Sequence, residues 1–239
     1  MQNIYKKNEL VFALIWIGVY VIGISIADSL SEQFGILKVA TVPVALVLSL
    51  FLYGWIRKNK LKQYYGLRPV ASADYRKYLY FLPLLILATA NLWNGMVFEH
   101  AFLDTFLFIV CMLFIGFLEE VIFRGFLFKA LSRKNVRSAL LISSVTFGMG
   151  HIVNLLNGAD FLPTLLQIGY ATAIGFLFTV LFMKTKSLWP GILAHAVINA
   201  TSLFAVDGKE GSIQLISSLV MVVLSVGYAL YLLRIVPES

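Results

Sequence analysis

The sequence predicts an all-α fold, a polytopic membrane bundle of about eight transmembrane helices with both termini in the cytoplasm. Of its 239 residues, 60% are hydrophobic and only 13% are charged, whereas a soluble domain carries about 25% charged residues. Apolar runs close to the ~20 residues that cross a bilayer recur along the whole chain. Lys and Arg are concentrated in alternate loops, as expected for loops on the cytoplasmic side.

Each expected span is an apolar run bounded by polar or basic residues. The first run follows Lys6 and Lys7, and at about 18 residues it is longer than the apolar region of a signal peptide, so we expect it to be retained. The expected spans are residues 10–27, 36–56, 78–93, 101–131, 139–156, 163–183, 190–206 and 213–236. Too little chain is left for a soluble domain, and residues 1–239 are therefore expected to form one membrane domain.

The distribution of Lys and Arg predicts the orientation of the spans in the membrane. With the N-terminus in the cytoplasm, every Lys and Arg except Lys38 and Lys209 falls in a segment assigned to the inner side, Arg124 included. The net charge of +7 is then a consequence of topology, and it requires no nucleic acid or other anionic partner. Very short loops and Lys-rich inner segments favour a bacterial plasma membrane. No sequence pattern indicates the oligomeric state.

Several protease classes are excluded by the motifs that are missing. The chain has one cysteine, Cys111, so it has no intrachain disulfide and no Cys-rich metal site. Cys111 lies in an apolar run without an adjacent histidine, and we interpret it as a packing residue. Neither a Gly-x-Ser-Gly serine motif nor a Gly-x-Gly-Asp aspartyl motif occurs.

Ionisable residues inside membrane spans are costly and usually mark a functional site, and Glu119, Glu120 and Arg124 lie away from the ends of the fourth span. Glu120 and Arg124 are four residues apart, which places them on one helix face as a potential ion pair. Glu119 is rotated from Glu120 by about 100°, so we expect the two carboxylates not to face one target. The predicted division is that Arg124 neutralises Glu120 while Glu119 acts on substrate as a general base or acid. The alternative is a polar cluster at the inner helix end.

Two further polar groups lie in the fifth and seventh spans. Gly148 and Gly150 thin one face of the fifth helix, which allows close helix approach and places His151 in the interior. His195 and Asn199 are four residues apart, and two N–H donors on one helix face can stabilise an oxyanion. Each group alone can be explained by hydrogen bonds between helices. The acidic group of the fourth span, His151, and the His195 and Asn199 pair occur together, however, and this combination is more specific for a functional site than any one of them.

The three motifs together resemble the CPBP family of intramembrane endopeptidases (CAAX protease and bacteriocin-processing, also called Abi). The motifs are Glu119-Glu120-x-x-x-Arg124, Phe147-x-x-x-His151 and His195-x-x-x-Asn199. The resemblance covers a catalytic core of about residues 100–205. The roles that it implies are activation of water by Glu119 and His151, oxyanion stabilisation by His195 and Asn199, and support from Glu120 and Arg124.

The resemblance also implies a substrate class and leaves the cofactor open. The substrate would be a membrane-tethered peptide or lipidated protein, such as a prenyl-CAAX C-terminus, a pheromone precursor or a bacteriocin leader. Glu119, His151 and His195 are a conceivable zinc ligand set, but no His-Glu-x-x-His motif occurs, so no metal cofactor is favoured.

The position of the motifs within their spans predicts an active site in the cytoplasmic half of the bilayer, open to the cytosol or the inner leaflet. Two other functions remain open at this point. A proton-coupled transporter would use the same acid and histidines as a relay, although no inverted repeat is present. A non-enzymatic membrane scaffold would need none of them.

Overall fold

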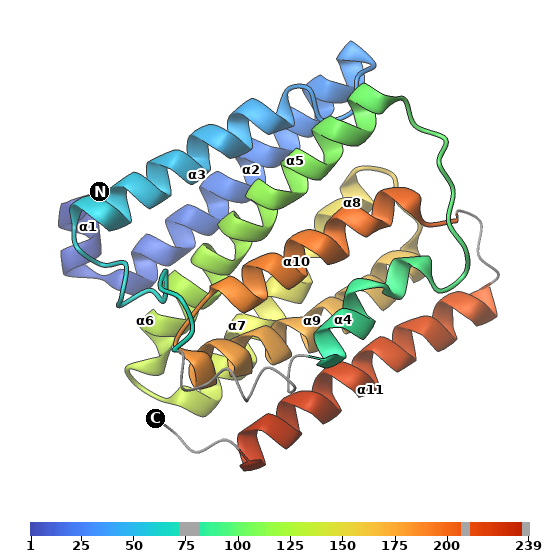
Figure 1. The fold of residues 1–239 in the computed structure, drawn as a ribbon. Coiled ribbons are helices and arrows are strands. Elements are labelled where there is room, and N and C mark those ends of the chain that lie inside the picture. The colour runs from blue at the N-terminus through green and yellow to red at the C-terminus, as the bar shows by residue number, and fades with distance from the viewer. Residues whose placement is uncertain (72–81, 207–210, 236–239) are drawn as a thin grey trace.

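The computed structural model describes residues 1–71, 82–206 and 211–235, and the helices in these ranges form one bundle (Figure 1). Apart from an isolated antiparallel bridge between Met96 and Ala205, every regular element in the described ranges is helical. The predicted all-α membrane bundle is therefore confirmed.

The helices follow the expected spans in order. Six described helical segments are long and apolar enough to cross a membrane. The long segments are α2 (Glu9–Phe34), α3 (Thr41–Lys58), α5 to α6 (Phe102–Ser132), α7 to α8 (Val136–Leu156), α9 (Phe161–Thr185) and α11 (Gly211–Ile235). The short ones are α1 (Gln2–Lys7), α4 (Leu82–Ala88), α10 (Trp189–Thr201) and η5 (Ser202–Phe204). The third expected span contains the short helix α4, and the seventh coincides with α10 and η5. The third expected span begins at Tyr78, outside the described residues, so the count of eight stays a prediction.

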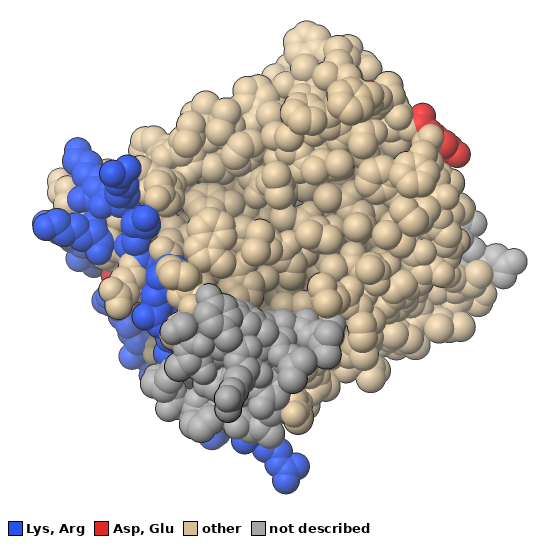
Figure 2. All heavy atoms as spheres, in the orientation of Figure 1, with Lys and Arg blue, Asp and Glu red and all other residues tan. Residues whose placement is uncertain are grey.

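Lys and Arg side chains gather at one end of the bundle, where α1 and α6 lie (Figures 1 and 2). We call this the basic end. Lys6 and Lys7 lie in the last turn of α1, Arg57 and Lys58 lie in the last turn of α3, and Arg133 and Lys134 line one cavity together with Lys6 and Lys7. Lys38 lies beyond the far end of α2, as expected, whereas Lys209, Arg76 and Lys77 are outside the described residues. The assignment of Arg124 to the inner segments is wrong, because its side chain is fully buried within the bundle.

The core is built by helices that pack around the α5 to α6 segment. Its N-terminal part packs against α3 and α10, while its central part contacts both α2 and α7. α9 packs between α7 and α11 on the other side of the bundle. Cys111 is fully buried in this core, in agreement with a packing role. The central part of the α5 to α6 segment is thus the point where α2 and α7 meet a common neighbour.

One of the two glycines expected to allow close helix approach does so. A Cβ on Gly148 would lie 2.8 Å from the carbonyl oxygen of Ile168 in α9, whereas a Cβ on Gly150 would meet nothing within 4 Å. We therefore expect Gly148→Ala to destabilise the protein by about 1–3 kcal/mol, the usual cost of overpacking. Gly150→Ala is the matched control two residues away, and it should leave the thermal unfolding midpoint of the purified protein unchanged or slightly raised. Equal midpoints for both variants would contradict this packing.

Candidate active site

The first motif lies where the α5 to α6 segment changes its winding. The α-helix α5 (Phe102–Glu119) ends at Glu119, and a π-helix, η3 (Glu120–Phe128), continues the chain into α6 (Lys129–Ser132). All nine residues of η3 are buried. π-Helical segments are rare and are frequent at functional sites. The sequence analysis assumed α-helical winding throughout and did not predict this change.

The predicted ion pair between Glu120 and Arg124 is present. Arg124 Nη1 lies 3.0 Å from Glu120 Oε1, and the two side chains are 0% and 1% exposed. The guanidinium carbon also lies 4.2 Å from the centroid of the Phe147 ring, at a distance typical of a cation–π interaction. Arg124 is thus paired with one carboxylate and lies over two aromatic rings inside the bundle, the second being Phe178 at 5.7 Å.

Two glycines leave the space that this ion pair occupies. A Cβ on Gly191 of α10 would lie 2.9 Å from Glu120 Oε2, and a Cβ on Gly175 of α9 would lie 3.0 Å from Arg124 Nη2. Both distances are shorter than ordinary van der Waals contact. Helices α9 and α10 therefore approach the pair closely only because these positions lack a side chain.

His195 of α10 connects the two glutamates. Its Nε2 lies 3.0 Å from Glu119 Oε2, and its Nδ1 lies 3.1 Å from Glu120 Oε1. The expectation that the two carboxylates cannot face one target is therefore wrong. The imidazole ring offers a nitrogen to each carboxylate, and the winding changes from α to π between the two residues. An imidazole that donates from both nitrogens carries a positive charge, which the two carboxylates surround.

Tyr20 of α2 is a member of this site that the sequence analysis missed. Its hydroxyl donates a hydrogen bond of 2.6 Å to Glu119 Oε1, and its side chain is buried. The two residues are 99 positions apart and share no motif. A signal does exist, because tyrosines in membrane helices are enriched at the two interfaces, whereas Tyr20 lies near the middle of α2.

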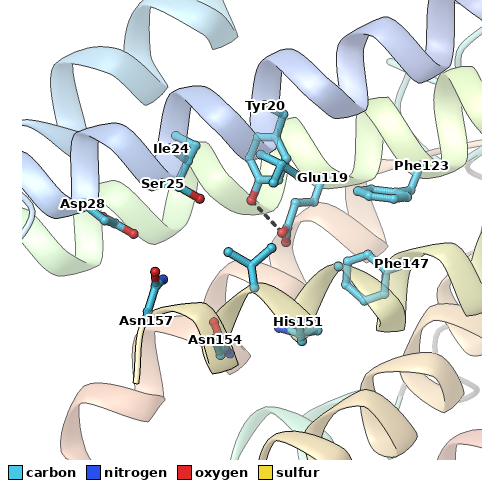
Figure 3. A pocket seen from close by; sticks show the side chains of 13 residues that line it. Tyr20, Ile24, Ser25, Asp28, Glu119, Phe123, Phe147, His151, Asn154 and Asn157 are labelled. Carbon is cyan, nitrogen blue, oxygen red and sulfur yellow. Dashed lines mark hydrogen bonds between the residues drawn. The ribbon is translucent and has the colours of Figure 1, made fainter. Parts of the chain in front are cut away.

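Glu119 and His151 line one cavity, which we call the site cavity (Figure 3). It has a volume of about 160 Å³ and lies between α2 on one side and the α7 to α8 segment on the other. His151 is in a 3₁₀ turn, η4 (Gly150–Ile152), between α7 (Val136–Met149) and α8 (Val153–Leu156). The polar side chains in the lining are Tyr20, Ser25, Asp28, Glu119, His151, Asn154 and Asn157.

The structure does not place all predicted site residues in this cavity. His195 contacts Glu119 from behind and is not part of the lining, and neither is Asn199, which is half-buried one turn further along α10. The role of Asn199 as an oxyanion donor stays a prediction. Asp28 and the two asparagines were missed, although Asn154 and Asn157 follow His151 at spacings of three and six residues.

The proposed zinc ligand set does not form in this arrangement. Among the described residues, no group of three or more His, Cys, Asp or Glu side chains is placed to hold a metal ion. His195 Nε2 is directed at Glu119 Oε2 and Nδ1 at Glu120, so neither ring nitrogen faces an open coordination position. The residues as arranged therefore do not fit a zinc ion.

The part of the chain that carries the three motifs is similar to known membrane proteases. Residues 101–201, which contain all three motifs, match the family described as Type II CAAX prenyl endopeptidase Rce1-like. The Putative membrane peptidase YdiL of Bacillus subtilis is 45% identical over 83 residues, which are 34% of this chain and 30% of the relative. The Probable CAAX prenyl protease 2 of Schizosaccharomyces pombe is 33% identical over 82 residues, 30% of either chain.

The matches confirm the family resemblance based on the three motifs. The aligned segments span less than a third of the length of either relative. No solved structure matches the chain.

Proposed function

We propose that this protein is an intramembrane endopeptidase that hydrolyses a peptide bond in a membrane-tethered, lipidated or hydrophobic peptide. The observation that carries the proposal is the site cavity of about 160 Å³, which Glu119 and His151 both line inside the bundle. The similarity of residues 101–201 to type II CAAX prenyl endopeptidases supports the reaction class. The name of the fission yeast relative supports prenylated proteins as one candidate substrate class.

The proposed reaction is direct attack of water on the peptide carbonyl. Glu119, assisted by His151, takes a proton from a water molecule in the cavity, and the water oxygen bonds to the carbonyl carbon. The carbonyl electron pair moves to its oxygen and forms a tetrahedral oxyanion. When the carbonyl reforms, the C–N bond breaks and the proton passes from Glu119 or His151 to the leaving nitrogen. One water is consumed, and a carboxyl group and an amine are released.

The buried network prepares Glu119 for this role. Arg124 and a protonated His195 carry two positive charges, and Glu119 and Glu120 carry two negative charges, so the network is neutral as a whole. Tyr20 and His195 each hold one oxygen of the Glu119 carboxylate. Because each carboxylate oxygen has two lone pairs, Glu119 can still accept a proton from water. These two hydrogen bonds fix the position of the Glu119 carboxylate before the reaction begins.

For the oxyanion we retain His195 and Asn199 as the proposed donors. In the resting arrangement the N–H at His195 Nε2 is directed at Glu119. Once Glu119 has taken the proton from water, its negative charge is lost and its hold on His195 weakens. The imidazolium N–H can then turn to the oxyanion that forms at the same moment. In this order of events, the contact between His195 Nε2 and Glu119 Oε2 connects the proposed base, Glu119, to the proposed oxyanion donor, His195.

The proposal is tested by quantitative peptidomics on cells that contain wild-type or Glu119→Ala protein at equal abundance. Defined new termini on hydrophobic or lipidated peptides are expected with the wild type and should be absent with the variant. Identical profiles would contradict peptide cleavage. In that case, solute uptake by proteoliposomes that is lost on His151→Ala would favour a transporter, and full complementation of a deletion by Glu119→Gln would favour a scaffold.

The role of Tyr20 is tested by Tyr20→Phe, which removes only the hydroxyl. A hydrogen bond to a charged group is worth about 1.5–3 kcal/mol, so we expect kcat on an identified substrate to fall roughly 10- to 100-fold with little change in KM. Tyr53→Phe is the matched control, because the Tyr53 hydroxyl bonds Lys62 Nζ outside the site at 2.9 Å. An equal effect of both substitutions on kcat would contradict a role for Tyr20 in positioning Glu119.

A further inference from the structure

The wall of the site cavity formed by α2 extends away from the basic end. Tyr20, Ile24 and Asp28 line the cavity at intervals of four residues, so they share one face of the helix (Figure 3). α2 begins at Glu9, directly after Lys6 and Lys7, and ends at Phe34. From Tyr20 to Asp28 the lining therefore moves toward the end of α2 that is remote from the basic residues.

The opposite wall of the site cavity, formed by the α7 to α8 segment, also extends away from the basic end. The α7 to α8 segment begins at Val136, beside Arg133 and Lys134, and ends at Leu156. Its cavity-lining residues run from Phe147 through His151 and Asn154 to Asn157, just past that end (Figure 3). Both walls thus carry polar side chains from the level of Glu119 to the end opposite the basic residues.

A second cavity, of about 330 Å³, continues this path. It shares Asp28 and Asn157 with the site cavity, and its lining includes the loop that holds Lys38. Acidic side chains predominate there, because Asp28, Glu32 and Asp104 face only one lysine. Asp28 is itself paired with Lys38 at 2.8 Å. The two cavities place polar groups continuously from Glu119 to the surface of this end.

Toward the basic end, aromatic side chains pack between the same helices in the described part of the chain. Phe12 of α2, Phe126 of η3 and Tyr65 are each no more than 2% exposed. The ring of Phe126 lies 5.1 Å from Phe12 and 4.9 Å from Tyr65, centroid to centroid. A cavity that includes Lys6 and Lys134 exists at the basic end, but its lining shares no residue with the site cavity.

We infer that the substrate reaches Glu119 from the end of the bundle opposite the basic residues, which the distribution of Lys and Arg places on the extracytoplasmic side. The inference rests on the proposed endopeptidase function, and it reverses the expected access from the cytosol. The substrate segment beside the scissile bond lies between α2 and the α7 to α8 segment, along Ser25, Asn154 and Asn157. The excess of acidic groups at the opening favours a peptide segment that is neutral or basic there.

The inference is tested by the accessibility of single cysteines to a membrane-impermeant, charged thiol reagent. Ser25→Cys and Asn157→Cys report on the path, and Lys134→Cys reports on the basic end. Cys111 is fully buried, so the unmodified chain measures the background. Reagent added to intact cells should label the first two variants and spare Lys134→Cys, which should react only in inside-out vesicles. Labelling of Ser25→Cys only in inside-out vesicles would overturn the inference, as would labelling of Lys134→Cys in intact cells.

A second readout separates this inference from the proposed function. Labelling of Ser25→Cys from outside should block cleavage of an identified substrate, whereas labelling of Lys134→Cys should not. Because labelling requires no catalysis, the same accessibility is expected when Glu119→Gln is added to each variant. External labelling of Ser25→Cys in a protein that cleaves nothing would support the path and contradict the endopeptidase.

Discussion

Glu119→Gln is expected to reduce the rate of peptide hydrolysis by roughly 10²–10⁴-fold, the usual contribution of a general base. The amide has nearly the shape of the carboxylate, so the contacts of this position with Tyr20 and His195 can be largely kept. What is lost is the ability to take a proton from water. We therefore expect kcat to fall while the protein remains folded, and single-turnover measurements with an identified peptide will give the size of the effect.

Glu9→Gln is the control for this substitution. Glu9 is a glutamate outside the cavity, paired with Arg133 Nη2 at 2.7 Å where the arginine is largely exposed. Exposed ion pairs contribute only about 0–1 kcal/mol, so hydrolysis by Glu9→Gln should match that of the wild type. If Glu119→Gln hydrolyses the substrate as fast as Glu9→Gln does, Glu119 is not the base and the assignment of the site is wrong.

The parts of the site that depend on local spacing could be predicted from the sequence. Glu120 and Arg124 are four residues apart on one helix, and helical winding alone brings them together. The length and apolar character of the spans likewise predicted the helices, because the bilayer sets how long they must be. Such features need no knowledge of how the helices pack.

The parts that depend on packing between helices could not be predicted. The contact of Tyr20 with Glu119 joins two helices that share no sequence pattern. The double contact of His195 depends on the π-helix that begins at Glu120, and no residue pattern identified that change of winding. Counting residues from the span ends predicts a site in the cytoplasmic half of the bilayer, and this depth stays a prediction. The side from which we infer access depends on how side chains such as Phe126 and Phe12 pack between helices.

Arg124→Met is expected to have the largest effect on stability. Arg124 is fully buried, and its removal leaves two carboxylates, Glu119 and Glu120, to share the single positive charge of His195 inside the bundle. Breaking a buried ion pair by removing one partner costs about 3–5 kcal/mol. The contact of the guanidinium with the Phe147 ring is lost as well. The thermal unfolding of the purified protein in detergent should therefore shift to a clearly lower temperature.

Two comparison variants separate the ion pair from loss of side-chain volume. Arg133→Met removes an arginine that is 60% exposed, and an exposed pair is worth about 1 kcal/mol or less. Glu120→Gln combined with Arg124→Met removes both charges, so it should be more stable than Arg124→Met alone because no uncompensated carboxylate remains. If the double variant is less stable than the single one, Glu120 is held by other groups. His195 is the group in position to do so, since its Nδ1 lies 3.1 Å from the same carboxylate oxygen that Arg124 contacts.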